Sequence, residues 1–374
     1  MKNQGSSSIL TRDIFCILGL PFDTVNLSET STLINSDIEQ KQRCFLTTPN
    51  LNFLITAQSD SLFFQSVVDS DLIIADGMPI IWIAKLLNIP LTTRVAGSDL
   101  FDKLSKQKIQ HKKTSVFFFG GQEGIAEKAS QELNRSSQAM SCCGFYDPGF
   151  VSVEKMSTPA IIEYINKTNP DFLLVALGAG KGQAWIQKNR EQLNAPIISH
   201  LGAVVNFVAG NVIRAPIFWQ QCGLEWLWRI KQEPGLWKRY SFDGLAFLKL
   251  LSFKVFPLAF YDKKLKKSDS FKTPATINYQ YIENSHCIVN ITGSVKHENL
   301  NNIKQTFFEI LKGKPVDVAL DCTELTYIDS SFIGTLLLFQ RQLNQQNCEL
   351  LLQNLPKRIY RILNLNNVLN RFQF

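Results

Sequence analysis

The stretch IIADGMPIIWIAKLLNIPLTTRVAGSDLF, residues 73–101, indicates the fold class of this chain. An apolar run ends on Asp76 and Gly77, a helical pattern follows, and a polar cluster then extends from Arg94 to Asp99. A short apolar run that ends in a turn and gives way to helical periodicity is typical of a strand–helix unit. Ligands of parallel sheets bind at the carboxyl ends of the strands, so we look for chemistry at Asp76.

The same alternation continues through the first two thirds of the chain. Helical periodicity at 123–135 and 158–170 follows apolar runs that resemble short buried strands. This pattern predicts a Rossmann-like α/β domain with a largely parallel sheet. The predicted strands are RDIFCILGLPFD (12–23), CFLTTPN (44–50), DLIIADG (71–77), TSVFFFGG (114–121) and DFLLVALGAG (171–180). Their ends carry Thr48, Asn50, Asp76, Gly77, Gly120, Gly121 and residues 178–181.

The length of 374 residues is enough for two domains. We place the first at 12–245 and a smaller α/β domain at 276–374, with strands and helices alternating again in the second. Residues 246–275 contain an amphipathic, basic segment and a linker, and 262–277 are charged and poor in large apolar groups.

The net charge of +7 is moderate, and its basic residues cluster among apolar ones between residues 238 and 267. Such a mixture favours an anionic membrane surface over nucleic acid as the partner. A solvated helix face with a charged linker is the alternative. The N-terminal residues lack the long apolar core of a signal peptide, which suggests a cytoplasmic protein at the inner face of the membrane.

The 8 cysteines are scattered, without a C-x-x-C pair, which suits a reducing compartment and argues against a zinc site. The four histidines are far apart in sequence. The D-x-D pattern at 69–71 precedes a strand, and we interpret it as a solvated helix end. No metal or other cofactor is predicted.

Two interpretations of Asp76 stay open on chemistry alone. A carboxylate partly desolvated at a strand end can act as a general base. It can equally cap the helix that begins near Pro79. Arg94 and the following AGSD offer a cation, a flexible backbone and a capping side chain, which together suit a phosphate or sugar hydroxyls.

Several long stretches resemble the WecG/TagA/CpsF glycosyltransferases, over about residues 12–245. The resemblance rests on TTPN, ADGMPIIWIAKLLNIPLTTRVAGSDLF, FFFGGQEGIAEKA, NPDFLLVALGAGKGQAWI, FVAGNVIRAPIFW and GLEWLWRIKQEPGLWKRY, in that order. It implies an inverting, metal-independent transfer of N-acetylmannosamine or a related sugar. The donor would be a UDP-sugar and the acceptor a polyprenyl-diphosphate-linked sugar at the cytoplasmic membrane face.

The resemblance also implies roles for individual residues. Asp76 would be the general base. Substrate would bind at Thr48, Asn50, Arg94, Asp99, Gly120, Gly121, Lys181 and Gln183. The lipid diphosphate and the membrane would meet Arg214, Arg229 and Arg239. Two positions depart from the family pattern, namely Gly182 within the usual P-K-Q-E, and Asn206 in place of an aspartate.

The stretch LDCTELTYIDSSFIGTLLLFQRQL resembles STAS domains, the fold of anti-sigma-factor antagonists, across 276–374. The resemblance makes Ser331 the candidate phosphorylation site, although Phe332 replaces the family's glycine and could block a kinase. A plain capping role for 329–331 is the alternative. The domain would bind a protein partner. A second hypothesis for the whole chain is a non-catalytic regulator that binds a nucleotide sugar.

Overall fold

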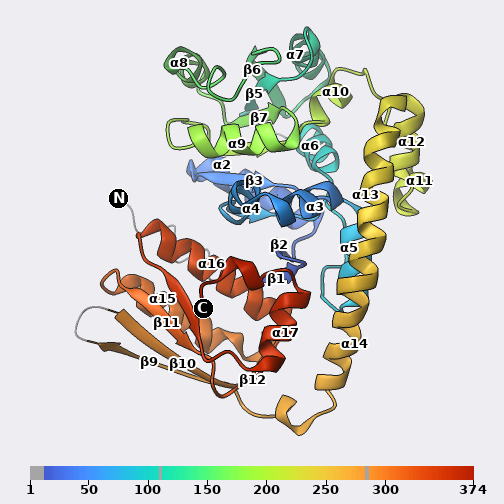
Figure 1. Ribbon diagram of the computed structural model, residues 1–374. Coiled ribbons are helices and arrows are strands. Elements are labelled where there is room, and N and C mark those ends of the chain that lie inside the picture. The colour runs from blue at the N-terminus through green and yellow to red at the C-terminus, as the bar shows by residue number, and fades with distance from the viewer. Residues whose placement is uncertain (1–11, 109–111, 283–285) are drawn as a thin grey trace. The chain divides into compact units, whose positions relative to one another are not determined.

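A computed structural model describes residues 12–108, 112–282 and 286–374, which form two compact units (Figure 1). The six-stranded unit comprises residues 25–81 and 93–244. The five-stranded unit comprises the described residues up to Thr24, residues 82–92 and residues 245–374. The chain therefore leaves the six-stranded unit between Asp76 and Arg94 and returns to it.

The six-stranded unit is built on a parallel sheet in the order β4-β3-β8-β7-β5-β6, which confirms the predicted α/β class. Two of these strands were not predicted, β6 and β8. The strands are β3 (Cys44–Thr47), β4 (Leu72–Ile73), β5 (Thr114–Gly120), β6 (Met140–Tyr146), β7 (Phe172–Ala176) and β8 (Ile197–His200).

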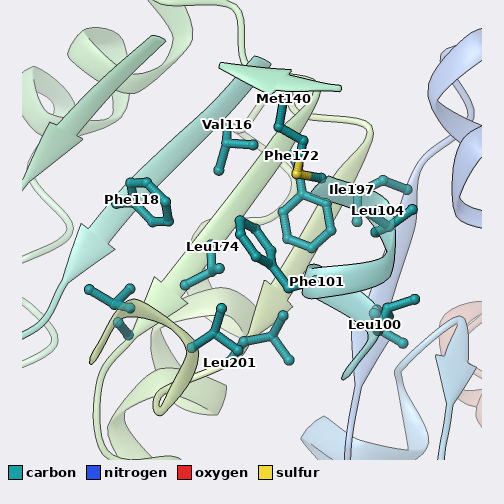
Figure 2. Close-up of a cluster of buried hydrophobic side chains, with 14 of the residues drawn as sticks. Leu100, Phe101, Leu104, Val116, Phe118, Met140, Phe172, Leu174, Ile197 and Leu201 are labelled. Carbon is teal, nitrogen blue, oxygen red and sulfur yellow. The ribbon is translucent and has the colours of Figure 1, made fainter. Parts of the chain in front are cut away.

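Alternating side chains of the central strands fill two cores, one on each face of this sheet. In β5, Val116 and Phe118 belong to one core, while Phe117 and Phe119 belong to the other. Figure 2 shows the first core, where Phe101 of α6 packs against the strand side chains. Burial on both faces explains why the strands are continuously apolar in sequence.

Helices alternate with these strands. Asn26 starts the first of them through a capping box with Glu29. The α-helices that lie in this unit, or begin in it, are α2 (Leu27–Gln40), α3 (Leu51–Ser59), α4 (Ser61–Val68), α5 (Met78–Leu86), α6 (Gly97–Lys106), α7 (Ile125–Ser136), α8 (Pro159–Lys167), α9 (Ala179–Asn189), α10 (Val204–Val208), α11 (Ile217–Gln221), α12 (Glu225–Gln232) and α13 (Trp237–Leu250).

The predicted strand 12–23 is wrong as a member of the parallel sheet. It forms an antiparallel hairpin of β1 (Ile14–Ile17) and β2 (Leu20–Asp23) within the five-stranded unit. The turn places Leu18 at φ 47° and Gly19 at φ 102°. Leucine rarely adopts this conformation, so a two-residue turn was not predicted here.

The five-stranded unit carries the predicted second domain. Its sheet has the order β12-β10-β11-β13, with β9 antiparallel to β10, and strands alternate with helices as predicted for this domain. Strand β12 was not predicted. The elements are β9 (Thr276–Ile282), β10 (His286–Val295), α15 (Leu300–Lys312), β11 (Asp317–Asp321), β12 (Leu325–Ile328), α16 (Ser330–Gln345), β13 (Leu350–Gln353) and α17 (Lys357–Leu365).

A long helical run precedes this sheet. It passes from η1 (Pro234–Leu236) through α13 (Trp237–Leu250) and the π-helical turn η2 (Leu251–Val255) to α14 (Phe256–Leu265). The predicted linker is thus helical in its first residues. By length and composition, the run Pro234–Leu265 is the one candidate for a membrane-spanning helix among the described residues.

Candidate active site

Backbone hydrogen bonds join the loops that follow β3 and β4 to the segment before α6. The N–H of Asp76 donates to the carbonyl of Pro49 at 2.9 Å, and the N–H of Val95 donates to Ala75 at 2.9 Å. These bonds bring together five of the predicted site residues, from three separate segments. They are Thr48, Asn50, Asp76, Arg94 and Asp99.

The carboxylate of Asp76 lies at the N-terminus of α6. It accepts a hydrogen bond from the backbone N–H of Gly97 and keeps partial exposure to solvent. Burial raises the pKa of Asp76 to about 6, although Arg94 opposes the rise. A carboxylate with this pKa is ionised at neutral pH and is basic enough to accept a proton. This hydrogen bond goes to α6, and a capping role of Asp76 for α5 stays a prediction.

Gly97 permits this close approach of α6 to the sheet. A Cβ atom at this position would lie 2.4 Å from Cδ2 of Leu201 and 3.7 Å from the hydroxyl oxygen of Thr48. The Thr48 side chain, which is nearly buried, therefore faces the same helix start as Asp76. Asn50 caps α3 by accepting from the N–H of Phe53 at 3.3 Å.

Arg94 is the centre of a network of charges. Its Nη1 lies 2.5 Å from Oε2 of Glu225, and its Nη2 lies 3.2 Å from Oδ2 of Asp99. Asp99 also pairs with Arg214. Two guanidinium groups and two carboxylates thus surround the strand end, and an anionic ligand would have to compete with these carboxylates for the arginines.

Sequence reasoning missed Glu225 and Gln220. Glu225 is the one acidic residue of the stretch GLEWLWRI, and this carboxylate was the signal that could have identified it as a site residue. It pairs with Arg94 and adds to the raised pKa of Asp76. Gln220 Oε1 accepts from Arg94 at 3.5 Å. Both come from the segment after β8, more than 120 residues from Arg94 in sequence.

A family model described as "Glycosyl transferase WecG/TagA/CpsF family" matches residues 15–258, well over half of the chain. The chain belongs to this family. It is a glycosyltransferase, and a STAS domain, matched at residues 278–374, follows the family domain.

Curated relatives share one name, N-acetylglucosaminyldiphosphoundecaprenol N-acetyl-beta-D-mannosaminyltransferase. The relative from Bacillus spizizenii is 29% identical over 217 residues, which cover 58% of this chain and 82% of the relative. The relative from Bacillus subtilis is 26% identical, over 60% of this chain and 85% of its own. The Staphylococcus aureus MW2 protein is 24% identical, over 67% and 94% respectively.

Two glycines of the glycosyltransferase end strand β5. Gly120 and Gly121 have φ values of 91° and 107°, a region that favours glycine. At Gly120 a Cβ would lie 2.9 Å from the carbonyl oxygen of Ala176. The backbone conformation and the packing against β7 therefore account for Gly120, and a role in binding substrate stays a prediction for both.

Lys181 and Gln183 lie apart from the cluster around Asp76. Lys181 is exposed and donates to the carbonyl of Val151 at 3.2 Å. Gln183 has no exposed surface, and its Nε2 donates to the hydroxyl of Thr47 at 3.4 Å. The Oε1 atom of Gln183 is buried without a hydrogen-bond partner. Gln183 thus contacts Thr47, the residue before Thr48, and its role in binding substrate stays a prediction.

Gly182, a departure from the family pattern, lies against a histidine that the sequence analysis did not select. A Cβ at Gly182 would be 2.1 Å from Cδ2 of His200. The ring is nearly buried at the end of β8, with Nε2 at 2.6 Å from the carbonyl oxygen of Leu177. Burial lowers the pKa of His200, which favours the neutral ring. The imidazole therefore takes the space beside residue 182. Asn206 lies in α10 with partial exposure.

The three predicted lipid-site arginines are placed differently. Arg214 joins the site through Asp99, and its Nε is buried without a hydrogen-bond partner. Arg229 also has a buried, unpartnered Nε, and its guanidinium lies 3.7 Å from Glu233. Arg239 is exposed over the ring of Tyr240.

The D-x-D segment is a helix end, but the prediction that it is solvated is wrong. Asp69 is buried at the C-terminus of α4, where it accepts from Gln65 at 2.9 Å and from Gln187 at 2.5 Å. Asp71 accepts from the N–H of Phe45. Within the described residues, no three His, Cys, Asp or Glu side chains gather as metal ligands.

Proposed function

We propose that this glycosyltransferase moves N-acetylmannosamine, or a related sugar, from a UDP-sugar to an acceptor linked to a polyprenyl diphosphate, for bacterial surface polysaccharide. The shared name of the curated relatives supports the acceptor and the sugar class. The resemblance described above supports the UDP-sugar. The observation that carries the proposal is the Asp76 carboxylate, which has a raised pKa and lies beside Thr48 and Arg94.

Asp76 acts as the general base in a single displacement. It takes the proton of the acceptor hydroxyl while that oxygen forms a bond to the anomeric carbon. The bond between the anomeric carbon and the UDP oxygen breaks, and its electron pair leaves with UDP. Attack opposite to the leaving group inverts the anomeric centre. Arg94 lies close enough to influence the charge of Asp76, and its guanidinium suits the diphosphate of UDP.

The arginines beyond the site bind the lipid diphosphate of the acceptor. A diphosphate oxygen would satisfy the buried Nε atoms of Arg214 and Arg229, which lack hydrogen-bond partners. Buried donors without partners are costly, so a ligand that satisfies them gains affinity. Arg239 extends the positive charge along the same segment of the chain.

Binding at the inner face of the membrane is part of the proposal, and the long helical run supports it. Leu245, Phe253, Phe256 and Phe260 are exposed along it, and Val255 and Leu258 are buried on another side. Lysines 263, 264, 266 and 267 follow this apolar stripe. An apolar stripe with adjacent lysines suits a helix that lies in the interface of an anionic bilayer.

A turnover assay with purified full-length protein tests the proposal. Several UDP-sugars are offered with an acceptor analogue that carries N-acetylglucosamine on a polyprenyl diphosphate, and UDP release and product are measured. We expect turnover with UDP-N-acetylmannosamine or a close relative. Nucleotide binding without turnover for every donor would instead support the non-catalytic regulator.

A further inference from the structure

The helix α16 of the STAS domain is covered by the N-terminal hairpin of the same chain. Ile14 of β1 packs against Leu338 of α16 in a buried pair. At Gly334, a Cβ would lie 2.6 Å from Cγ2 of Ile14 and 3.3 Å from the backbone N of Cys16. The backbone of β1 thus runs directly over a glycine of the helix, an approach that a larger residue would prevent.

The hairpin also contacts other parts of the STAS domain, through the residue before β1 and through its turn. Lys304 of α15 donates to the carbonyl of Arg12 at 2.8 Å. Near the turn, a Cβ at Gly19 would lie 3.3 Å from the carbonyl oxygen of Asn367, just after α17. The hairpin region therefore meets two further segments of the STAS domain, α15 and the residues after α17, as well as the α16 face.

Ser331 lies on the same face of α16 that the hairpin covers. Positions 331, 334 and 338 follow the spacing of one helix face. Ser331 has no exposed surface, and its hydroxyl donates to Oδ1 of Asp329 at 2.6 Å. Phe332 is also buried, and whether it hinders a kinase stays a prediction.

The start of α16 is linked to the hairpin through a neighbouring histidine. Oδ2 of Asp329 accepts from the backbone N–H of His297 at 2.8 Å. The His297 ring lies 5.1 Å from the ring of Phe15, and its Nδ1 lies 3.4 Å from Oδ1 of Asp13. His297 therefore contacts Asp329, the capping residue beside Ser331, and also Phe15 of the hairpin and Asp13 just before it.

We propose that the α16 face of the STAS domain is a docking surface for the chain's own N-terminal hairpin, and that a partner or an enzyme that modifies Ser331 reaches this face only when the hairpin leaves. The hairpin fits it in shape, through Gly334, and in apolar character, through Ile14 and Leu338. The proposal does not depend on the sugar transferred.

Hydrogen exchange of the full-length protein, followed by mass spectrometry, tests the docking. Gly334→Leu adds a side chain where Ile14 lies, while it removes a helix-weakening glycine from α16. We expect faster exchange at residues 14–23, with β10 and β11 still protected. Gly244→Leu is the matched control, because open space surrounds Gly244 in its helix. Unchanged protection of the hairpin in Gly334→Leu would overturn the proposal.

Accessibility of position 331 provides the second measurement. In Ser331→Cys, alkylation of the new thiol is measured on the proteolytic peptide that contains residue 331, so that the native cysteines do not contribute to the signal. We expect alkylation at least about tenfold faster when Gly334→Leu is added, as for a site exposed by local opening. If Gly334→Leu also unfolds β10 and β11, Ile14→Ser replaces it, since that change removes the apolar contact without adding volume. Equal alkylation rates with and without the displacing change would refute the model.

Discussion

The Nη1 atom of Arg94 lies 2.5 Å from Oε2 of Glu225, a residue 131 positions later in the chain. This pair joins the start of α12 to the segment before α6, within the six-stranded unit. Glu225 and Arg94 shift the pKa of Asp76 in opposite directions. The protonation of the proposed base therefore depends on a contact that spans a third of the sequence.

Replacement of the proposed base is the most direct test of the mechanism. Asp76→Asn removes the proton acceptor while it keeps the shape of the side chain. We expect kcat to fall by about 10²-fold or more, with UDP binding retained by calorimetry. In the unaltered enzyme, kcat/KM should decrease as pH falls through about 6, because the base becomes protonated. Asp102→Asn, in an exposed pair with Lys106, is the control. Equal activity in Asp76→Asn would remove Asp76 from the mechanism.

Neutralising Glu225 should move the acidic limb of the pH profile. The Glu225 charge raises the pKa of Asp76, so Glu225→Gln should shift that limb to lower pH. The profile of kcat/KM measures the effect. Glu233→Gln is the matched control, because Glu233 pairs with Arg229 instead. A limb at the same pH in Glu225→Gln and in the unaltered enzyme would show that the pair does not tune the base.

The glycine at position 182 is required by the histidine beside it. In Gly182→Ala the new methyl group collides with the His200 ring, and we expect a loss of about 1–3 kcal/mol in the free energy of unfolding. The double variant Gly182→Ala/His200→Ala should recover part of that loss, since it removes the ring. Denaturant unfolding measures both. Additive losses in the double variant would contradict the explanation.

The buried Asp171 should stabilise the six-stranded unit at neutral pH. Burial alone would raise its pKa, but hydrogen bonds from Lys41, Ser115 and Lys112 lower it to about 2. The ionised group therefore contributes stability that is complete above the ordinary pKa of 3.8 and is lost as pH falls toward 2. We expect Asp171→Asn to cost about 1–3 kcal/mol at pH 7 in chemical unfolding.

That cost should shrink in acid, because the unaltered protein loses the same contribution there. Glu163→Gln is the control, since its pair with Lys167 is exposed and should change stability by less than about 1 kcal/mol. A cost for Asp171→Asn that does not change between pH 7 and pH 3 would argue against the ionised pair as its source.

The exposed stripe on the long helix should carry the membrane contact. The double change Phe253→Asp/Phe256→Asp places charge on side chains that are 68% and 52% exposed, so the fold should be kept. We expect binding to anionic vesicles to fall at least about tenfold in co-sedimentation. Leu62→Asp, at a leucine that is 83% exposed elsewhere, is the control. Equal loss in both variants would mean that this helix is not the membrane contact.

Much of the fold could be predicted because the hydrophobic periodicity of a strand or helix, and with it the buried face, can be recognised in a short stretch of sequence. The runs at β3, β5 and β7 are mostly apolar, as expected for strands buried on both faces. Strand β6 was not predicted because most of its residues are only partly buried, so its sequence is less apolar. The hairpin 14–23 was not predicted because its turn places Leu18 at positive φ, a conformation that leucine rarely adopts.

The sequence by itself determined the α/β class, the acid at the end of β4, and the family to which the chain belongs. Only the tertiary structure decided that Glu225 pairs with Arg94, that His200 fills the space beside Gly182, and that the N-terminal hairpin lies on α16. The reason is physical. Local patterns fix strands and helices, whereas desolvation, ion pairing and steric fit depend on segments that meet only after the chain has folded.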